Sequence, residues 1–149
     1  MPPANPKKLI VEGHADLFSV VGLMRAYIDW PEDRHQAPVH IERGGGINEI
    51  LEEGYLTSNL KAHGVEVVGI MVDADVNPAG RYQSIKQRCS QLFPRLPNML
   101  PTEGLIATND DGLRMGVWIM PDNQSEGYIE TFLRWVNSRS AGTFMATCR

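Results

Sequence analysis

One segment, residues 65–72 with the sequence VEVVGIMV, constrains the fold more than any other. It is rich in β-branched residues and almost free of polar ones, which is typical of a central strand in a parallel sheet covered on both faces. The chain then runs directly into Asp73, Ala74 and Asp75. The pattern therefore predicts a buried strand that places two acidic residues at its carboxyl end.

Strand-like and helix-like segments alternate along the rest of the chain. Four further segments have strand patterns: residues 7–12, 39–42, 105–108 and 113–120, the last two flanking a turn at 110–112. Four segments space their apolar residues as helices do: residues 17–28, 47–64, 78–92 and 129–136. This order predicts an α/β, Rossmann-like fold with a mostly parallel central sheet and helices on both faces.

The chain has the size and composition of one globular domain. Its 149 residues, 42% hydrophobic and 21% charged, exclude the polar, highly charged class of disordered chains. We expect a single domain over 1–149, with its core at about 7–136 and no informative pattern in 138–149. No stretch of 18 apolar residues and no export signal is present, so we expect a cytoplasmic protein without a membrane partner.

Charge and cysteine content narrow the function further. The net charge of −4 gives no general attraction for nucleic acid, so such a partner requires a local basic patch or bound cations. Cys89 and Cys148 form no C-x-x-C pair and lie at no metal-ligand spacing from a histidine. We expect reduced thiols in both.

Three carboxylates follow predicted strands: Glu12, Asp73 and Asp75. Carboxyl ends of parallel strands meet at one edge of a sheet, where ligands bind in this class of fold. Asp73 and Asp75 are two residues apart in an extended segment, so their side chains can converge. Clustered carboxylates repel one another unless one is protonated or a cation lies between them, and oxygen ligands suit Mg²⁺ or Mn²⁺. The pattern predicts a divalent-metal site for phosphate chemistry.

Two motifs resemble those of the Toprim domains found in topoisomerases, bacterial primases, OLD-type nucleases and recombination mediators. Residues 9–13 (LIVEG) are similar to the Toprim strand that ends in glutamate, with Asp16 placed like an extra acid of OLD-like nucleases. Residues 72–75 (VDAD) are similar to the Toprim D-x-D motif. Residues 120–130 (MPDNQSEGYIE) further resemble a small uncharacterised prokaryotic Toprim-related family. The resemblance covers about residues 7–136.

The resemblance implies a Mg²⁺- or Mn²⁺-dependent phosphodiesterase acting on DNA or RNA, as a subunit of a defence or repair system. Glu12 would be the general acid or base, and Asp73 and Asp75 would hold the metal. Further predicted metal ligands are Asp16, Asp122 and Glu130, and Gly13 is a predicted substrate contact. Arg81 is predicted to contact substrate because, like Arg88 and Arg114, it can bind a nucleic-acid backbone, although arginines on one helix face often only face solvent. An ATPase on a separate chain and a second copy of this chain are further candidate partners.

Two other functions stay open. Residues 71–75 also resemble the nucleophile strand of haloacid-dehalogenase-like phosphatases, although that family normally has this strand first. The alternative without catalysis is a Toprim scaffold that binds nucleic acid or protein partners.

Several of these residues also have structural interpretations. Asp16 fits the first turn of a helix, and the spacing from Asn123 to Glu126 fits a capping box that opens the last helix. His14 fits an ordinary polar loop residue. The glycines at 44–46 lack the P-loop pattern, so we expect no nucleotide pocket there.

Overall fold

Strand β3 (Val67–Asp73) lies at the centre of a five-stranded sheet, as its β-branched sequence predicts. The structure is a computed structural model that describes residues 5–147. The sheet order is β2-β1-β3-β5-β4, and β4 is the antiparallel strand. The other strands are β1 (Lys7–Val11), β2 (His40–Arg43), β4 (Leu105–Thr108) and β5 (Arg114–Met120).

The pairing of the strands fixes which residues meet at the carboxyl edge. β1 lies directly beside β3 in parallel, with Val11 opposite Met71. On the other side of β3, Asp73 pairs with Met120 of β5. The ends of β2, β1, β3 and β5 therefore lie in a row along one edge of the sheet, and the residues that follow each strand become neighbours.

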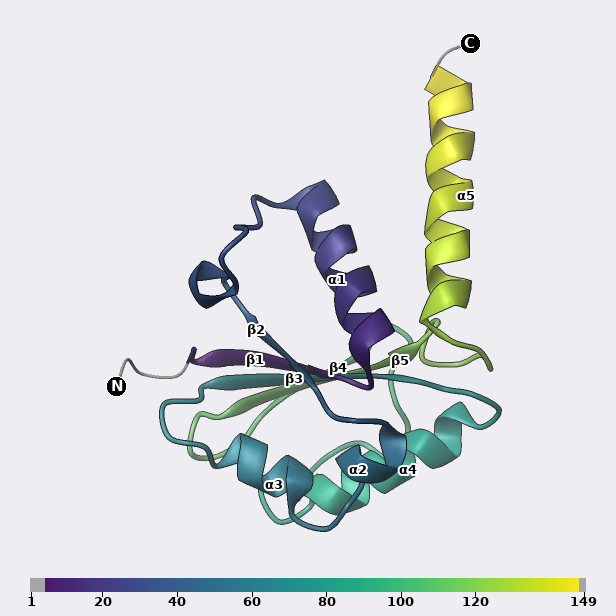
Figure 1. Ribbon diagram of the computed structural model, residues 1–149. Coiled ribbons are helices and arrows are strands. Elements are labelled where there is room, and N and C mark those ends of the chain that lie inside the picture. The colour runs from purple at the N-terminus through teal and green to yellow at the C-terminus, as the bar shows by residue number, and fades with distance from the viewer. Residues whose placement is uncertain (1–4, 148–149) are drawn as a thin grey trace.

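Helices cover both faces of the sheet (Figure 1). Helices α1 (His14–Tyr27) and α5 (Ile129–Thr147) lie on one face, and α5 extends away from the sheet beyond its first turns. The opposite face carries α2 (Ile47–Ile50), α3 (Tyr55–Leu60) and α4 (Pro78–Cys89). A short 3₁₀ turn, Arg34–Gln36, lies in the loop between α1 and β2. The expected α/β architecture is confirmed.

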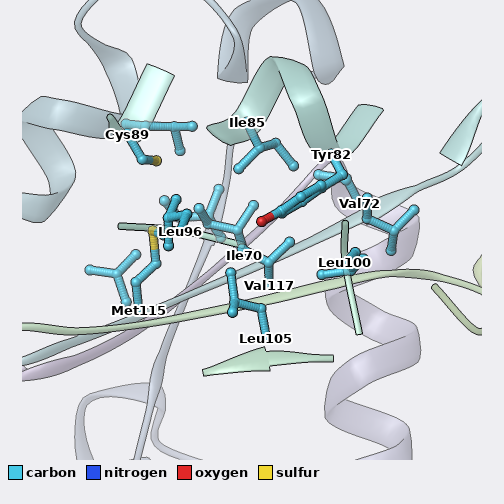
Figure 2. Close-up of a cluster of buried hydrophobic side chains, with 14 of the residues drawn as sticks. Ile70, Val72, Tyr82, Ile85, Cys89, Leu96, Leu100, Leu105, Met115 and Val117 are labelled. Atoms are coloured by element: carbon cyan, nitrogen blue, oxygen red, sulfur yellow. The ribbon is translucent and has the colours of Figure 1, made fainter. Parts of the chain in front are cut away.

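The larger hydrophobic core lies between the sheet and α2, α3 and α4 (Figure 2). Val68, Ile70 and Val72 of β3 point into it and are almost fully buried. Each such aliphatic side chain contributes about 1.5–3 kcal/mol to stability by leaving water. Tyr82 of α4 is also buried, and its hydroxyl donates a 2.6 Å hydrogen bond to the carbonyl of Pro97. This core holds β3, and hence Asp73, in a fixed position.

The central strand is covered on both faces, as predicted, but not to the same extent. Its residues alternate between fully and partly buried. The partly buried ones face α1 and α5, and these two helices contribute to a smaller cluster that includes Val11, Val20 and Ile129. The face that carries α2, α3 and α4 therefore provides most of the packing.

Two helical predictions also need correction. Residues 47–64 form two short helices instead of one, because Gly54 adopts a left-handed conformation with φ of 89° that a helix cannot continue through. Helix α5 extends to Thr147, well beyond the predicted end at 136.

Cys148 lies outside the described residues. Among residues 5–147, no helix combines the length and the apolar character that crossing a membrane requires.

Candidate metal centre at the carboxyl edge of the sheet

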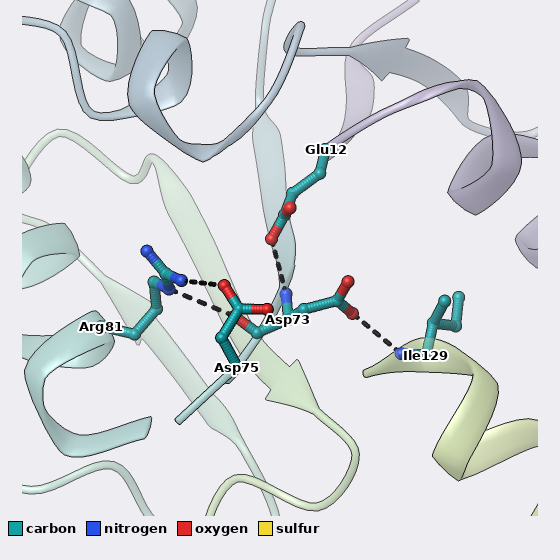
Figure 3. Close-up of polar contacts among 5 residues, drawn as sticks. All are labelled: Glu12, Asp73, Asp75, Arg81 and Ile129. Carbon is teal, nitrogen blue, oxygen red and sulfur yellow. Dashed lines mark hydrogen bonds and ion pairs between the residues drawn. The ribbon is translucent and has the colours of Figure 1, made fainter. Parts of the chain in front are cut away.

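Glu12 and Asp73 meet at the ends of neighbouring parallel strands (Figure 3). Glu12 follows the last residue of β1, and Asp73 is the last residue of β3. The Glu12 carboxylate accepts a 2.7 Å hydrogen bond through Oε1 from the backbone N–H of Asp73. The predicted adjacency of these two acidic residues is therefore present, and it is fixed by a direct contact between the two strand ends.

The glycines at 44–46 hold the backbone of Glu12. The N–H groups of Gly45 and Gly46 both donate to the Glu12 carbonyl, at 3.0 and 2.9 Å. Gly45 and Gly46 have φ values of 88° and 114°, which glycine adopts far more readily than other residues. Because these two amides bind the Glu12 carbonyl, the loop fixes the position of the Glu12 backbone.

Asp73 also serves the start of helix α5. Its Oδ1 accepts a 2.8 Å hydrogen bond from the backbone N–H of Ile129, the first residue of that helix (Figure 3). The first amides of a helix lack intrahelical partners, and a carboxylate there interacts favourably with the helix dipole. Asp73 therefore links the sheet edge to α5 through its side chain.

Asp75 is held by its backbone and by Arg81. It has a left-handed backbone conformation with φ of 53°, and it exchanges hydrogen bonds of 3.0 and 2.9 Å with Gly127. Its Oδ2 accepts a 2.5 Å hydrogen bond from Arg81 Nη2, and Arg81 Nε donates a 3.2 Å hydrogen bond to the Asp73 carbonyl. The Arg81 side chain is 18% exposed. Arg81 therefore clamps the two aspartates from α4, and its predicted role in substrate binding stays a prediction.

The electrostatics of the edge favour proton uptake by its carboxylates. Burial, as the largest cause, and the charges of Glu12, Asp16 and Glu130 together raise the pKa of Asp73 to about 7, although the hydrogen bond from Ile129 acts in the opposite direction. Burial also raises the pKa of Glu12, with smaller contributions from Asp16 and Asp75. These carboxylates repel one another in a partly desolvated setting, and a bound proton or cation would relieve that repulsion.

Two of the remaining predicted ligands, Asp16 and Glu130, lie in the first turns of helices next to the site. Asp16 lies in the first turn of α1, where its Oδ2 accepts a 3.0 Å hydrogen bond from Gly13 N–H, and burial raises its pKa. Glu130 is in the first turn of α5, and its charge acts on both Asp16 and Asp73. These two acids therefore border the site. Gly13 supplies the extended N-cap of α1, and nothing in the structure tests its predicted contact with substrate.

Asp122 is engaged in its own turn after β5. Burial opposes its ionisation, but hydrogen bonds from Ser125 and Gln124 outweigh that effect and lower its pKa. Those bonds come from the Ser125 N–H at 2.7 Å, the Ser125 hydroxyl at 2.9 Å and the Gln124 N–H at 3.1 Å. Asp122 is therefore a turn residue in this structure, and its role as a metal ligand stays a prediction.

The predicted capping box at Asn123 and Glu126 is wrong. Helix α5 begins only at Ile129, and Asn123 is 4% exposed with φ of 70°. The Asn123 side chain accepts from the Ile119 N–H at 2.7 Å and donates to the Thr102 carbonyl at 3.0 Å. It therefore ties the loop to β5, and the first amide of α5 is bound by Asp73 instead.

The structure also places two basic residues beside Glu12 that the sequence patterns did not single out as a pair. Arg43 is the last residue of β2, and His14 is the first residue of α1. Arg43 Nη1 lies 2.5 Å from His14 Nδ1. This contact would have been predictable from the adjacency of β2 and β1, because residues at or just after the ends of neighbouring parallel strands lie close together, as Glu12 and Asp73 do.

The carboxylates at this edge offer oxygen atoms, the type of ligand that hard divalent cations prefer. Among residues 5–147, no donor hydrogen-bonds the second carboxylate oxygen of Glu12, Asp73 or Asp75. No three acidic, histidine or cysteine side chains in the described part of the chain are close enough to hold an ion between them. Mg²⁺ commonly binds through only one or two carboxylates together with water and substrate phosphates.

Comparison with known proteins gives one match. Residues 6–145, which include all the strands and the whole candidate site, match the model of a family described as a protein of unknown function, DUF3226. No curated protein and no solved structure matches the chain. Since the match spans most of the 149 residues, the chain belongs to the DUF3226 family.

Proposed function

We propose that this protein is a Toprim-type, Mg²⁺- or Mn²⁺-dependent phosphodiesterase that cleaves DNA or RNA. The observation that carries the proposal is the contact between Glu12 and Asp73 at neighbouring strand ends, where both pKa values are raised. A glutamate after the first strand and a D-x-D segment after the central strand, adjacent and parallel, are the arrangement that the Toprim resemblance implies. Perturbed carboxylates at such an edge are typical of functional sites.

Asp73 and Asp75 would hold the metal through carboxylate oxygens that no described residue engages. The bound ion would neutralise charge on the phosphate and make a bound water more acidic. Asp16 and Glu130 are placed to contribute negative potential around it, since their charges already act on Asp73.

Glu12 is the residue best suited to transfer a proton. Its raised pKa brings the neutral form closer to physiological pH, so the carboxyl can both accept and donate a proton. Its backbone is fixed by Gly45 and Gly46, and its Oε1 is fixed by Asp73. This bracing limits the positions that its other oxygen can occupy beside a substrate.

A non-catalytic scaffold is the second candidate, and a specific observation favours it. Glu12, Asp73 and Asp75 each have an internal hydrogen-bond partner, so each also has a structural role. On this account the carboxylates hold β1, β3, α4 and α5 together, and the edge binds a partner without chemistry. The scaffold predicts no cleavage under any condition.

A cleavage screen separates these two functions. Single- and double-stranded DNA and RNA are incubated with Mg²⁺, Mn²⁺ or a chelator, using wild type, Glu12→Gln and Asp75→Asn. We expect cleavage that requires metal and falls by about 10²-fold or more in either variant, the usual range for removal of general acid or base catalysis. Asp111→Asn is the control, since Asp111 lies on the exposed turn between β4 and β5, at the opposite edge.

Folding is checked by far-UV circular dichroism for each variant. Absence of carboxylate-dependent cleavage of all four substrates would favour the scaffold, whereas a phosphoenzyme at Asp73 would favour the phosphatase. The proposal further assigns the protein to the cytoplasm, with nucleic acid as its substrate and, where an ATPase takes part, a separate chain supplying it.

A further inference from the structure

Arg43 and His14 form a basic pair at the same edge as the acidic site. Arg43 ends β2, the strand next to β1, and His14 lies two residues after Glu12. Arg43 Nη1 contacts His14 Nδ1 at 2.5 Å. A guanidinium can only donate, so Nδ1 is the acceptor and the imidazole carries its proton on Nε2. The pair therefore presents several N–H donors and no acceptor to an incoming ligand.

The charge of Arg43 is not balanced by an acid. The ion pairs among the described residues use Lys8, Arg81 and Arg95, and none of them uses Arg43. Both Arg43 and His14 are exposed. An unpaired arginine whose neighbour is another donor forms a site for an anion, and the planar guanidinium matches the oxygens of a phosphate.

The distribution of charge along the edge is uneven. The strand ends run in the order β2, β1, β3, so Arg43, Glu12 and Asp73 follow one another in that direction. Arg81 lies next to Asp73 on the α4 side. Glu130, in contrast, brings negative charge from the α5 side. The line from β2 to α4 therefore has an arginine at each end and the acids Glu12 and Asp73 between them, and a polyanion that follows it is attracted at its ends and needs a bound metal ion in the middle.

We infer that Arg43, with His14 as its partner, binds a backbone phosphate of a nucleic-acid strand that crosses the edge from β2 over Glu12 toward Arg81. This inference rests on the proposed function, since it defines how the substrate lies in that same site. It also supplies one of the local cations that a chain with a net charge of −4 needs for binding nucleic acid. The contact is to phosphate, so it is insensitive to base sequence.

The test is binding of a fluorescein-labelled thymidine oligonucleotide, measured by anisotropy with Mg²⁺ over a range of salt concentrations. Glu12→Gln serves as the background, so that cleavage does not consume the probe. Arg43→Gln is compared with Arg43→Lys and with Arg114→Gln. Arg114 is the matched control because it is an exposed arginine at the opposite edge, at the start of β5, and takes no part in the described ion pairs.

We expect Arg43→Gln to weaken binding about tenfold, as for loss of one charged hydrogen-bonding contact. The slope of log affinity against log salt should become shallower by about 0.7, the value for one phosphate contact on a single strand. Arg43→Lys should retain most of the affinity because it keeps the charge. Arg114→Gln should bind the oligonucleotide as tightly as Glu12→Gln alone. Urea denaturation midpoints establish that each variant is folded. If Arg43→Gln does not fold, Arg43→Met, which also lacks the charge, is compared with Arg114→Met, and the same loss of affinity is expected.

The inference is overturned if Arg43→Gln binds as tightly as Arg114→Gln, or, where Arg43→Gln does not fold, if Arg43→Met binds as tightly as Arg114→Met. It is also overturned if thymidine monophosphate competes as strongly, per molecule, as the oligonucleotide, because that result indicates a mononucleotide site instead of a strand. Failure of the proposed function is distinct. If the wild-type protein cleaves nothing but its binding still depends on Arg43, the proposed function fails and the inference stands. If the wild-type protein cleaves nucleic acid but Arg43→Gln changes neither binding nor KM, only the inferred path of the strand is refuted.

Discussion

The Asp73 side chain has a structural role and also a strongly raised pKa. Its Oδ1 binds the first amide of α5, while its burial and the charges of Glu12, Asp16 and Glu130 raise its pKa to about 7. A group with such a pKa is partly protonated near neutral pH. The folded state therefore has a cost of ionising Asp73 that the unfolded chain does not have, and that cost depends on pH.

We expect Asp73→Asn to remove this pH dependence. The pKa of Asp73 is higher in the folded protein than in the unfolded chain, so the folded state binds more protons between about pH 4 and 7, and stability falls as the pH rises through that window. In a chelator, the variant should exceed wild type by about 1 kcal/mol at pH 8, allowing for solvent screening of a half-buried group, and by less at pH 5. Thermal melts at both pH values measure the difference, and a constant difference would contradict the assignment.

Arg81 is the residue that holds Asp75 in place, and its removal should be costly. Arg81→Gln leaves both the Asp75 carboxylate and the Asp73 carbonyl without their donor, so we expect a loss of about 1–2 kcal/mol in urea denaturation. Arg88→Gln on the same helix is the control, because Arg88 is exposed, and it should change stability by less than about 0.5 kcal/mol. Equal effects of the two variants would show that the hydrogen bonds from Arg81 to Asp75 and to the Asp73 carbonyl do not contribute to stability.

At the scale of elements, the site depends on the loop between β2 and α2. Gly44, Gly45 and Gly46 donate their amides to the carbonyls of Val11 and Glu12, so this loop fixes the end of β1. A side chain at Gly44 would place its Cβ 2.3 Å from Cγ1 of Ile50, which is fully buried and cannot move aside. The loop and the core beneath it therefore form one unit.

A pair of glycine substitutions tests this dependence. Gly44→Ala should destabilise the protein by about 1–3 kcal/mol, as overpacking of a core does. Gly22→Ala should instead stabilise it by about 0.5–1 kcal/mol, because Gly22 lies within α1 and an added Cβ meets no atom within 4 Å. Denaturation curves of the two variants give the comparison. A neutral Gly44→Ala would mean that the loop adapts and does not brace Glu12.

Helices and strands with a regular hydrophobic pattern were predictable from the sequence, whereas contacts between distant loops were not. The β-branched run of β3 and the short strand before Gly13 predict where Asp73 and Glu12 lie, because parallel strands end at one edge. The role of Asn123 was missed because its partners, Ile119 and Thr102, are set by tertiary structure. The pairing of Arg43 with His14 likewise depends on the neighbouring positions of β2 and β1.

On the scale of the whole molecule, one edge of the sheet carries the candidate site. The larger core positions β3, the glycine loop positions Glu12, and α5 contributes the amide bound by Asp73. The molecule as a whole is acidic, so binding of a polyanion at this edge depends on cations, either bound metal or Arg43 and Arg81.

Binding of Mg²⁺ to the folded state should raise thermal stability. If Mg²⁺ binds with Kd of about 1 mM, then about 10 mM adds roughly 1.4 kcal/mol by mass action. For a domain of this size the melting temperature should rise by about 3–6 °C. NaCl at matched ionic strength corrects for screening of the carboxylates. Asp73→Asn should gain less from Mg²⁺ than wild type, and Asp111→Asn should gain as much; an equal response of all three would exclude Asp73 as a ligand.

The most direct test of the central claim is a crystal structure of the protein soaked in Mn²⁺, with the ion located by its anomalous scattering. The metal-dependent phosphodiesterase account predicts a peak at the carboxyl edge between β1 and β3, with an oxygen of Asp73 in the coordination shell and Asp75 or Glu12 beside it. The same crystals of Asp73→Asn should lose the peak. A well-ordered edge that binds no Mn²⁺ at saturating concentration, with Asp73 still bound only to Ile129, would contradict the account and leave the scaffold.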